Sequence, residues 1–308
     1  MSDALHPRHA SPRSRVLTIA LPIGLAVTAL GALWAMTEVP PVAEAVVPPS
    51  PVVVADLPGV EVASVAAADP CADQAVIDAL AAGDDEAVVV AFGGGAPFRA
   101  AVVAGSAPCI SLTDPVRRWV VVNKTHSLAP ADYEPAQMTQ APVEMTTESR
   151  LIRADAAAAL GDMAAALEAS GAGVLGMNNA YRSYGLQVSN YSGQVASAGQ
   201  VEADQGSARP GFSEHQTGLA VDVVACSSGC GEIGAFGGTA ESDWVAAHAW
   251  EYGFIVRYED GAMATTGYEP EPWHLRYVGP ALANAYHDGG YRTLEEFFGL
   301  PAAPDYAH

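Results

Sequence analysis

Hydrophobic positions along the second half of the chain follow two periods, which predict a mixture of helices and strands. Residues 147–170 carry an apolar stripe at helical spacing, with Thr147 as the expected N-cap and Gly171 as the end of the helix. Strand-type runs are interleaved with further helical runs, without a regular βαβ order. The pattern therefore predicts an α+β fold, an antiparallel sheet with flanking helices. We expect strands at 119–122, 174–177, 219–224, 254–258 and 273–277, and helices at 184–198, 243–252 and 293–298.

An uncharged apolar run, 16–36, precedes all of these elements. It is 21 residues long, enough to cross a bilayer as a helix, and Arg8, Arg13 and Arg15 come before it. We therefore expect a basic cytoplasmic tail over 1–15 and a single membrane-spanning anchor that leaves the rest of the chain outside. The alternative is a signal sequence, with 43–45 as a weak cleavage motif and a secreted product.

The region after the anchor divides by composition. Residues 37–58 contain prolines among valine and alanine, which is typical of an extended linker. Residues 59–115 are expected to form a small module of unknown function. Its predicted parts are a helix at 74–82 and a hairpin of strands at 87–92 and 99–103, joined by a glycine turn at 93–95. A main domain, 116–300, and a tail, 301–308, complete the chain.

Charge and cysteine content narrow the environment of the protein. The formal net charge of -21 argues against nucleic acid as a partner. Four cysteines are an even number, which in an exported chain predicts disulfides. Four cysteines allow three pairings. The short spacing favours Cys226 with Cys230, which leaves Cys71 with Cys109. A metal site built from cysteines is the alternative, but no second pair lies near Cys226 and Cys230.

Side chains that can bind a metal stand inside two short runs of small and apolar residues. His215 and Asp222 are seven residues apart, which suits a loop ligand followed by a strand ligand, with Gly218 allowing a close approach. His274 can supply a third ligand. Two imidazoles and a carboxylate suit catalytic zinc, whose fourth position holds water. Taken alone, each histidine is more typical of a hydrogen-bonded structural residue.

Three further residues are candidates for catalysis or substrate binding. Glu271, three residues before His274, is a candidate general base, and Glu269 is a competitor that spacing does not exclude. Arg182 follows a predicted strand. It either pairs with an acid at the surface or holds a substrate carboxylate with both arms of its guanidinium.

These residues lie in longer motifs that resemble those of the VanY-type D-alanyl-D-alanine carboxypeptidases, in the M15 family of zinc peptidases. The resemblance covers residues 116–299 and implies the Hedgehog/DD-peptidase fold. It does not extend to the module or to the segment 226–241, which we expect to form a rim of the cleft. The motifs that carry the resemblance are 122–124, 180–184 with Gln187, 213–222, 250–254 and 271–279.

The resemblance implies roles for the candidate residues. It implies Zn²⁺ bound by His215, Asp222 and His274, with Glu271 rather than Glu269 as the base that takes a proton from water. The implied reaction is hydrolysis of the terminal D-alanine of peptidoglycan stem peptides that end in D-Ala-D-Ala.

The resemblance also implies a substrate pocket and leaves other functions open. Arg182 would hold the terminal carboxylate of the substrate, and Gln187 and Ser213 would line the pocket. The alternatives are an L,D-carboxypeptidase or a cell-wall endopeptidase of the same fold, or a non-catalytic wall-binding module stabilised by zinc.

Overall fold

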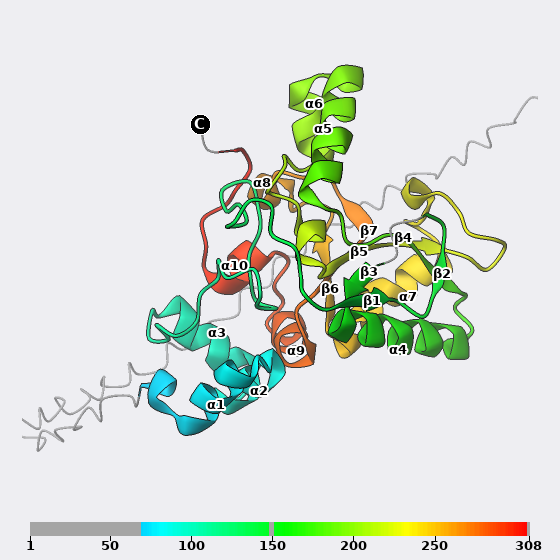
Figure 1. Ribbon diagram of the computed structural model, residues 1–308. Helices are drawn as coiled ribbons and strands as arrows, with labels where there is room; N and C mark the ends of the chain where they lie inside the picture. The colour runs from blue at the N-terminus through cyan, green and yellow to red at the C-terminus, as the bar shows by residue number, and fades with distance from the viewer. Residues whose placement is uncertain (1–68, 148–150, 307–308) are drawn as a thin grey trace, which may run out of the picture. The chain divides into compact units, whose positions relative to one another are not determined.

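The computed structural model describes residues 69–147 and 151–306 (Figure 1). All of these residues belong to one compact unit. The predicted cytoplasmic tail (1–15), membrane anchor (16–36) and linker (37–58) lie outside the described residues. Within the described ranges, no single helix is long and apolar enough to cross a membrane. The helices 85–91 and 95–103 have the length and apolar composition of a membrane span only when they are taken together, and the pair is bent by 83°.

The main sheet of the described chain has five strands and is largely antiparallel, as the sequence predicts. Its order is β2-β4-β5-β7-β6, and only the β2–β4 pair is parallel. A separate two-stranded sheet joins β1 to β3. The strands span Met138–Gln140 (β1), Glu144–Met145 (β2), Leu151–Arg153 (β3), Leu175–Asn179 (β4), Ala220–Ala225 (β5), Phe254–Tyr258 (β6) and Glu271–Tyr277 (β7).

Helices lie on both sides of this sheet. On one side, α4 and α7 pack against the strands, and the pair α5 and α6 projects from the other side (Figure 1). The α-helices span Gln74–Ala82 (α1), Asp85–Ala91 (α2), Gly95–Val103 (α3), Ala154–Ser170 (α4), Tyr184–Ala198 (α5), Gln200–Gly206 (α6), Ala240–His248 (α7), Met263–Thr266 (α8), Pro280–Asp288 (α9) and Leu294–Phe298 (α10). Short 3₁₀ turns span Pro70–Ala72 (η1), Glu214–Thr217 (η2), Ile233–Ala235 (η3) and Ala249–Tyr252 (η4).

The central strand β5 divides its side chains between the two faces of the sheet. Val221 and Val223 are fully buried and belong to the same hydrophobic cluster as Leu160 and Met163 of α4. Because side chains alternate along a strand, Asp222 points to the opposite face. The apolar core therefore fixes the orientation of β5 and turns one carboxylate away from the core.

Two helix boundaries differ from the prediction. The predicted helix at 147–170 begins only at Ala154, because Leu151 and its neighbours pair with β1 as β3. The helix predicted at 243–252 begins at Ala240, since the side chain of Thr239 accepts a hydrogen bond from the backbone N–H of Ser242. It continues as η4 to Tyr252.

The predicted hairpin in the N-terminal module is wrong, since both of its strands are helical. The valine-rich run belongs to α2, where the Asp84 side chain accepts a hydrogen bond from the Ala87 backbone N–H. Such a cap, with Asp85 in the first turn, stabilises a helix over the β preference of valine. Gly95 is not merely part of a turn. A Cβ at this position would stand 2.1 Å from the Ala281 carbonyl oxygen, so glycine lets α3 approach α9.

The predicted strand at 119–122 is buried but does not join a sheet. Its backbone groups find other partners: the Val121 N–H donates to the Leu112 carbonyl. The Nη2 group of Arg276 donates hydrogen bonds to the carbonyls of both Arg118 and Val120. The apolar composition correctly predicts burial. The hydrogen bonds that a neighbouring strand would donate to this segment come instead from a guanidinium.

The N-terminal helices are not a separate module, because they share a core with the C-terminal helices. Val88, Phe98 and Trp119 lie in one hydrophobic cluster with Leu282 of α9 and Phe297 of α10. Both sets of helices belong to the same unit, which includes all the described residues. The division predicted at 115/116 therefore does not mark an independent core.

Both predicted disulfides are present. One joins Cys71 to Cys109 across the N-terminal helices, and the other joins Cys226 to Cys230 just after β5. The described chain has no free cysteine.

Replacing Phe98 with alanine tests whether the shared core unfolds as one unit. Phe98 is fully buried, and its ring lies 5.1 Å from those of Phe92 and Trp119. We expect a loss of about 3–5 kcal/mol in the free energy of unfolding, still in a single transition by circular dichroism and tryptophan fluorescence. The matched control, Ile77→Ala, changes a half-exposed side chain and should cost about 0.5 kcal/mol or less. An early separate transition in Phe98→Ala would indicate two independent units.

Candidate active site

The segment from Ser213 to Asp222 folds back so that its histidine lies over the next strand. It forms the turn η2, which ends at Gly218 with φ of 67°. A Cβ there would stand 3.2 Å from Pro135 Cγ and 3.3 Å from Arg153 Cγ, so both the left-handed backbone and the close contacts favour glycine. The chain then enters β5, which carries Asp222. His215 thus lies on a turn and Asp222 on the strand that follows it, the placement that the sequence predicts for these two candidate ligands.

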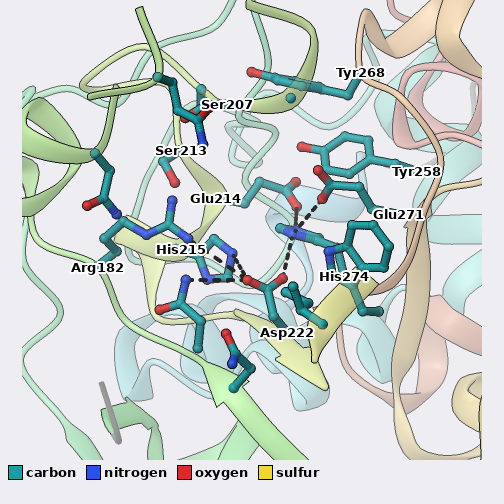
Figure 2. A pocket seen from close by; sticks show the side chains of 18 of the residues that line it. Arg182, Ser207, Ser213, Glu214, His215, Asp222, Tyr258, Tyr268, Glu271 and His274 are labelled. Carbon is teal, nitrogen blue, oxygen red and sulfur yellow. Dashed lines mark hydrogen bonds and ion pairs between the residues drawn. The ribbon is translucent and has the colours of Figure 1, made fainter. Parts of the chain in front are cut away.

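Strand register brings the third member of the cluster to the same place. Asp222 of β5 pairs directly with His274 of β7, so their side chains emerge side by side on one face of the sheet. Asp222 Oδ1 lies 3.2 Å from His274 Nδ1, and Oδ2 lies 3.2 Å from His215 Nε2. One ligand atom from each of the three residues lies within 4.8 Å of the others. Figure 2 shows the three side chains converging on the cleft floor.

This cluster has the donor atoms and charge that a zinc ion requires. Asp222 Oδ1 is buried and has no hydrogen-bond partner among the described residues, which is costly unless the oxygen meets a cation. Burial opposes the ionisation of Asp222, but the two imidazoles hold its pKa well below the usual range. Burial and the Arg182 charge lower the pKa of His215 against the pull of Asp222, which favours the neutral imidazole that binds metals. Two imidazoles and one carboxylate are a ligand set of catalytic zinc.

The backbone also orients His215 through its second ring nitrogen. His215 Nδ1 lies 2.8 Å from the Ala180 carbonyl oxygen, an acceptor that places the ring proton on Nδ1. Nε2 then faces Asp222 with its lone pair. A metal ligand commonly has its ring orientation and tautomer set in this way.

Glu271 stands beside the cluster with the properties of a general base. Its Oε2 lies 3.5 Å from His274 Nδ1. Burial raises the pKa of Glu271 to about 7, helped by the Asp222 carboxylate and opposed by His274 and Arg182. A base whose pKa lies near neutrality suits proton transfer at neutral pH. Glu269, the competitor in the sequence, is exposed and does not line the cleft, so the geometry favours Glu271.

Arg182 faces the cleft rather than the outer surface. Its Nη1 donates to Gln187 Oε1 at 2.7 Å, and Nη2 lies 3.9 Å from Asp222 Oδ2. Gln187 is itself fully buried and donates from Nε2 to the Ala208 carbonyl, so it holds the guanidinium in place. Arg182 Nε is buried, and no residue in the described part of the chain accepts a hydrogen bond from it. An unsatisfied guanidinium edge in a cleft is suited to an anionic ligand.

The cleft around these groups is far larger than one amino acid requires. Its volume is about 670 Å³, and Ser213 lies in its lining together with Arg182, Glu271 and the three candidate ligands. From the segment 226–241, Ile233 reaches the lining, as the rim prediction expects. One wall is a face of α5 made of small, uncharged side chains: Ser189, Asn190, Gly193, Gln194 and Ser197.

Several residues of the site were not identified from the sequence. Asn179 donates from Nδ2 to Asp222 Oδ2 at 3.3 Å, and Tyr258 places its ring 4.9 Å from that of His274. Glu214 has a side chain that is completely buried and lies 3.3 Å from His274 Nε2. The signal for Glu214 was its position, because it is a charged residue that directly precedes the candidate ligand His215.

Comparison with known proteins gives a consistent family. The family model described as "VanY: D-alanyl-D-alanine carboxypeptidase" matches residues 149–280. The Bacillus subtilis protein YodJ, which carries the name of a carboxypeptidase, is 40% identical over 192 residues, covering 61% of this chain and 69% of YodJ. The D-alanyl-D-alanine carboxypeptidase of Enterococcus faecalis is 39% identical over 106 residues, which cover 34% of this chain and 37% of that protein.

A solved structure adds a relative with a different named specificity. The LdcB LD-carboxypeptidase is 41% identical, and the match covers 60% of this chain and 87% of that chain with a TM-score of 0.56. The similarity therefore extends to the mixed α+β peptidase fold. Among these relatives the names describe both a D-alanyl-D-alanine and an LD-carboxypeptidase.

Proposed function

The chain belongs to the VanY family of carboxypeptidases, and on that premise we propose that it is a zinc-dependent D,D-carboxypeptidase. Its substrates are peptidoglycan stem peptides that end in D-Ala-D-Ala, and it removes the terminal D-alanine. The observation that carries the proposal is the convergence of His215, Asp222 and His274, with an unpartnered carboxylate oxygen, beside Glu271 in one cleft.

The side chains of the cleft divide the work of hydrolysis between them. His215, Asp222 and His274 would hold the zinc ion, which when bound supplies a Lewis acid for the scissile carbonyl and makes water nucleophilic near neutral pH. Glu271 takes the proton of the attacking water on its carboxylate and gives it to the amine of the leaving D-alanine. A raised pKa near 7 lets the same group act first as base and then as acid.

Arg182 would determine the direction in which a peptide binds along the cleft. In Figure 2, Arg182 and Glu271 lie on opposite sides of Asp222. A terminal carboxylate bound to the free edge of the Arg182 guanidinium would place the last peptide bond over the metal ligands. The rest of the stem peptide then has the remainder of the cleft, including the α5 wall. A free carboxylate next to the scissile bond is a feature of exopeptidase substrates, which favours a carboxypeptidase over an endopeptidase.

Replacing Arg182 with alanine should reduce kcat/KM for peptides with a free C-terminus by about 10- to 100-fold. This is the usual worth of a charge-assisted hydrogen bond, about 1.5–3 kcal/mol. The measurement compares each peptide with its C-terminal amide, in wild type and variant, at equal zinc content. A selective loss on the free acid supports the carboxylate contact. An equal loss on both peptides would show that Arg182 acts in some other way.

The mixed specificity of the relatives makes an L,D-carboxypeptidase the second candidate, since the LdcB structure is similar over most of its length. Mass spectrometry of stem peptides incubated with the zinc-loaded protein distinguishes the two. We expect a pentapeptide ending in D-Ala-D-Ala to lose one alanine, and a tetrapeptide ending in a single D-Ala to stay intact. Cleavage of the tetrapeptide alone would assign L,D specificity, and fragments from an internal bond would indicate an endopeptidase.

The catalytic groups also argue against a non-catalytic wall-binding module. A structural zinc site needs neither a general base nor an arginine that faces the cleft with an unpaired Nε, and the cleft offers both in Glu271 and Arg182.

We further propose that the enzyme works outside the membrane. Two disulfides support an oxidising compartment, and peptidoglycan stem peptides lie in the same compartment. The apolar run 16–36 would anchor the chain or direct its secretion. Both roles agree with a cleft that acts on the cell wall.

A further inference from the structure

Glu214 connects a buried ionic cluster to the imidazole of His274. Its carboxylate is 0% exposed. Glu214 Oε2 lies 3.3 Å from His274 Nε2, while the other ring nitrogen, Nδ1, lies 3.2 Å from Asp222 Oδ1. Carboxylates therefore lie at both nitrogens of the His274 ring, Glu214 at Nε2 and Asp222 with Glu271 at Nδ1 (Figure 2).

The other oxygen of Glu214 belongs to a set of buried charges. Oε1 accepts hydrogen bonds from Arg257 Nε at 3.0 Å and from Arg276 Nη1 at 2.9 Å. Arg257 in turn donates two hydrogen bonds to the carboxylate of Glu295 in α10, and Asn123 donates a third. The side chains of Glu214, Arg257, Arg276 and Glu295 are all 0% exposed.

The two carboxylate oxygens of Glu214 have different partners, Oε1 in the buried charge cluster and Oε2 at His274. Burial of four charges is expensive, and the mutual pairing of two arginines with two glutamates offsets that cost. Glu214 Oε1 pairs with both arginines, and both carboxylate oxygens of Glu295 pair with Arg257. Oε2 of Glu214 instead accepts from His274 Nε2, a contact that the pairing of the arginines does not require.

We propose that Glu214 is a positioning residue of the active site, which holds His274 with its ring proton on Nε2 so that the lone pair of Nδ1 faces Asp222. Histidines that bind metals usually donate the other ring N–H to such a partner, and its loss typically costs 10- to 100-fold in metal affinity. The arginines fix the carboxylate in turn, so the orientation of one ligand depends on Arg257 of β6 and Arg276 of β7. This inference rests on the proposed zinc site.

The test compares two variants that each remove one carboxylate charge from the cluster. Glu214→Gln loses the charge that faces His274, whereas Glu295→Gln loses a charge that is hydrogen-bonded to Arg257 and Asn123 and does not line the cleft. Zinc affinity is measured by chelator competition on the full chain, and the ligand field by the visible spectrum of the Co²⁺-substituted protein. We expect Glu214→Gln to bind zinc 10- to 100-fold more weakly with a shifted cobalt spectrum. Glu295→Gln should keep the wild-type affinity and spectrum, even if its stability falls.

A third variant separates positioning from folding. Glu214→Asp keeps a negative charge for the arginines but withdraws the carboxylate from His274 by one methylene, so it should fold and still bind zinc more weakly than wild type. Wild-type affinity and spectrum in Glu214→Asp and in any folded Glu214→Gln would overturn the inference. So would an equal loss in Glu295→Gln. If the wild type itself bound no zinc, the proposed function would fail together with this inference.

Discussion

Glu271→Gln should remove almost all peptide hydrolysis while the protein keeps its zinc. Glutamine has nearly the same shape but accepts no proton at neutral pH, so the water and the leaving amine lose their proton carrier. Because a general base typically contributes 10²- to 10⁴-fold, we expect kcat to fall on the order of 10³-fold. The measurement is the rate of D-alanine release at saturating peptide, with zinc content determined by elemental analysis on the same sample.

The matched control for this prediction is Glu269→Gln, two residues away. Glu269 is exposed and outside the cleft lining, so this variant should retain wild-type activity and zinc content. Near wild-type activity in Glu271→Gln, or loss of activity in Glu269→Gln, would refute the assignment of Glu271 as the general base. Loss of zinc from Glu271→Gln would instead point to a fourth ligand, since Glu271 Oε2 is 3.5 Å from His274 Nδ1.

Metal removal should have the second large effect. A chelator should abolish hydrolysis in the wild-type protein, and added Zn²⁺ should restore it. His215→Ala should lower the bound zinc and fail to recover activity at the same Zn²⁺ concentration, because one of three protein ligands is gone. The check is zinc per chain by elemental analysis together with the release of D-alanine.

The control for ligand loss is a histidine of the same chain outside the cluster. His248 is half-exposed and pairs with Glu251, so His248→Ala should keep full zinc content and activity. Full zinc occupancy in His215→Ala would refute ligation by that residue. Full activity after complete removal of metal would refute the zinc mechanism as a whole.

Much of the candidate site could be predicted because its residues are close in sequence or belong to compact motifs. His215 and Asp222 lie on one turn and the strand that follows it, so their spacing already restricts their geometry. Helix α5 and strand β6 have the predicted bounds, because their end signals are local. Ser183 caps α5 by accepting from the Leu186 N–H, and Gly253 ends the helical segment before β6.

The errors arose where a local preference competed with distant partners. The valine-rich run in α2 has strand composition, but its cap and its burial against the C-terminal helices make it helical. Residues 119–122 are apolar enough for a strand, yet the guanidinium of Arg276 binds the carbonyls of Val120 and the preceding Arg118 from 156 residues or more away in sequence. No window of neighbouring residues contains that information.

The sequence by itself determined the chemistry on offer: the ligand types, the candidate base, the arginine, and the cysteines available for disulfides. The tertiary structure decided which of these groups meet. Strand register sets Asp222 beside His274, and burial distinguishes Glu271 from Glu269. The role of Glu214 also depends on folding, because its partners Arg257, His274 and Arg276 lie 43 or more residues away in sequence and reach it only through β6 and β7. Residue types fix what a side chain can do, whereas packing fixes its neighbours, its exposure to water and hence its pKa.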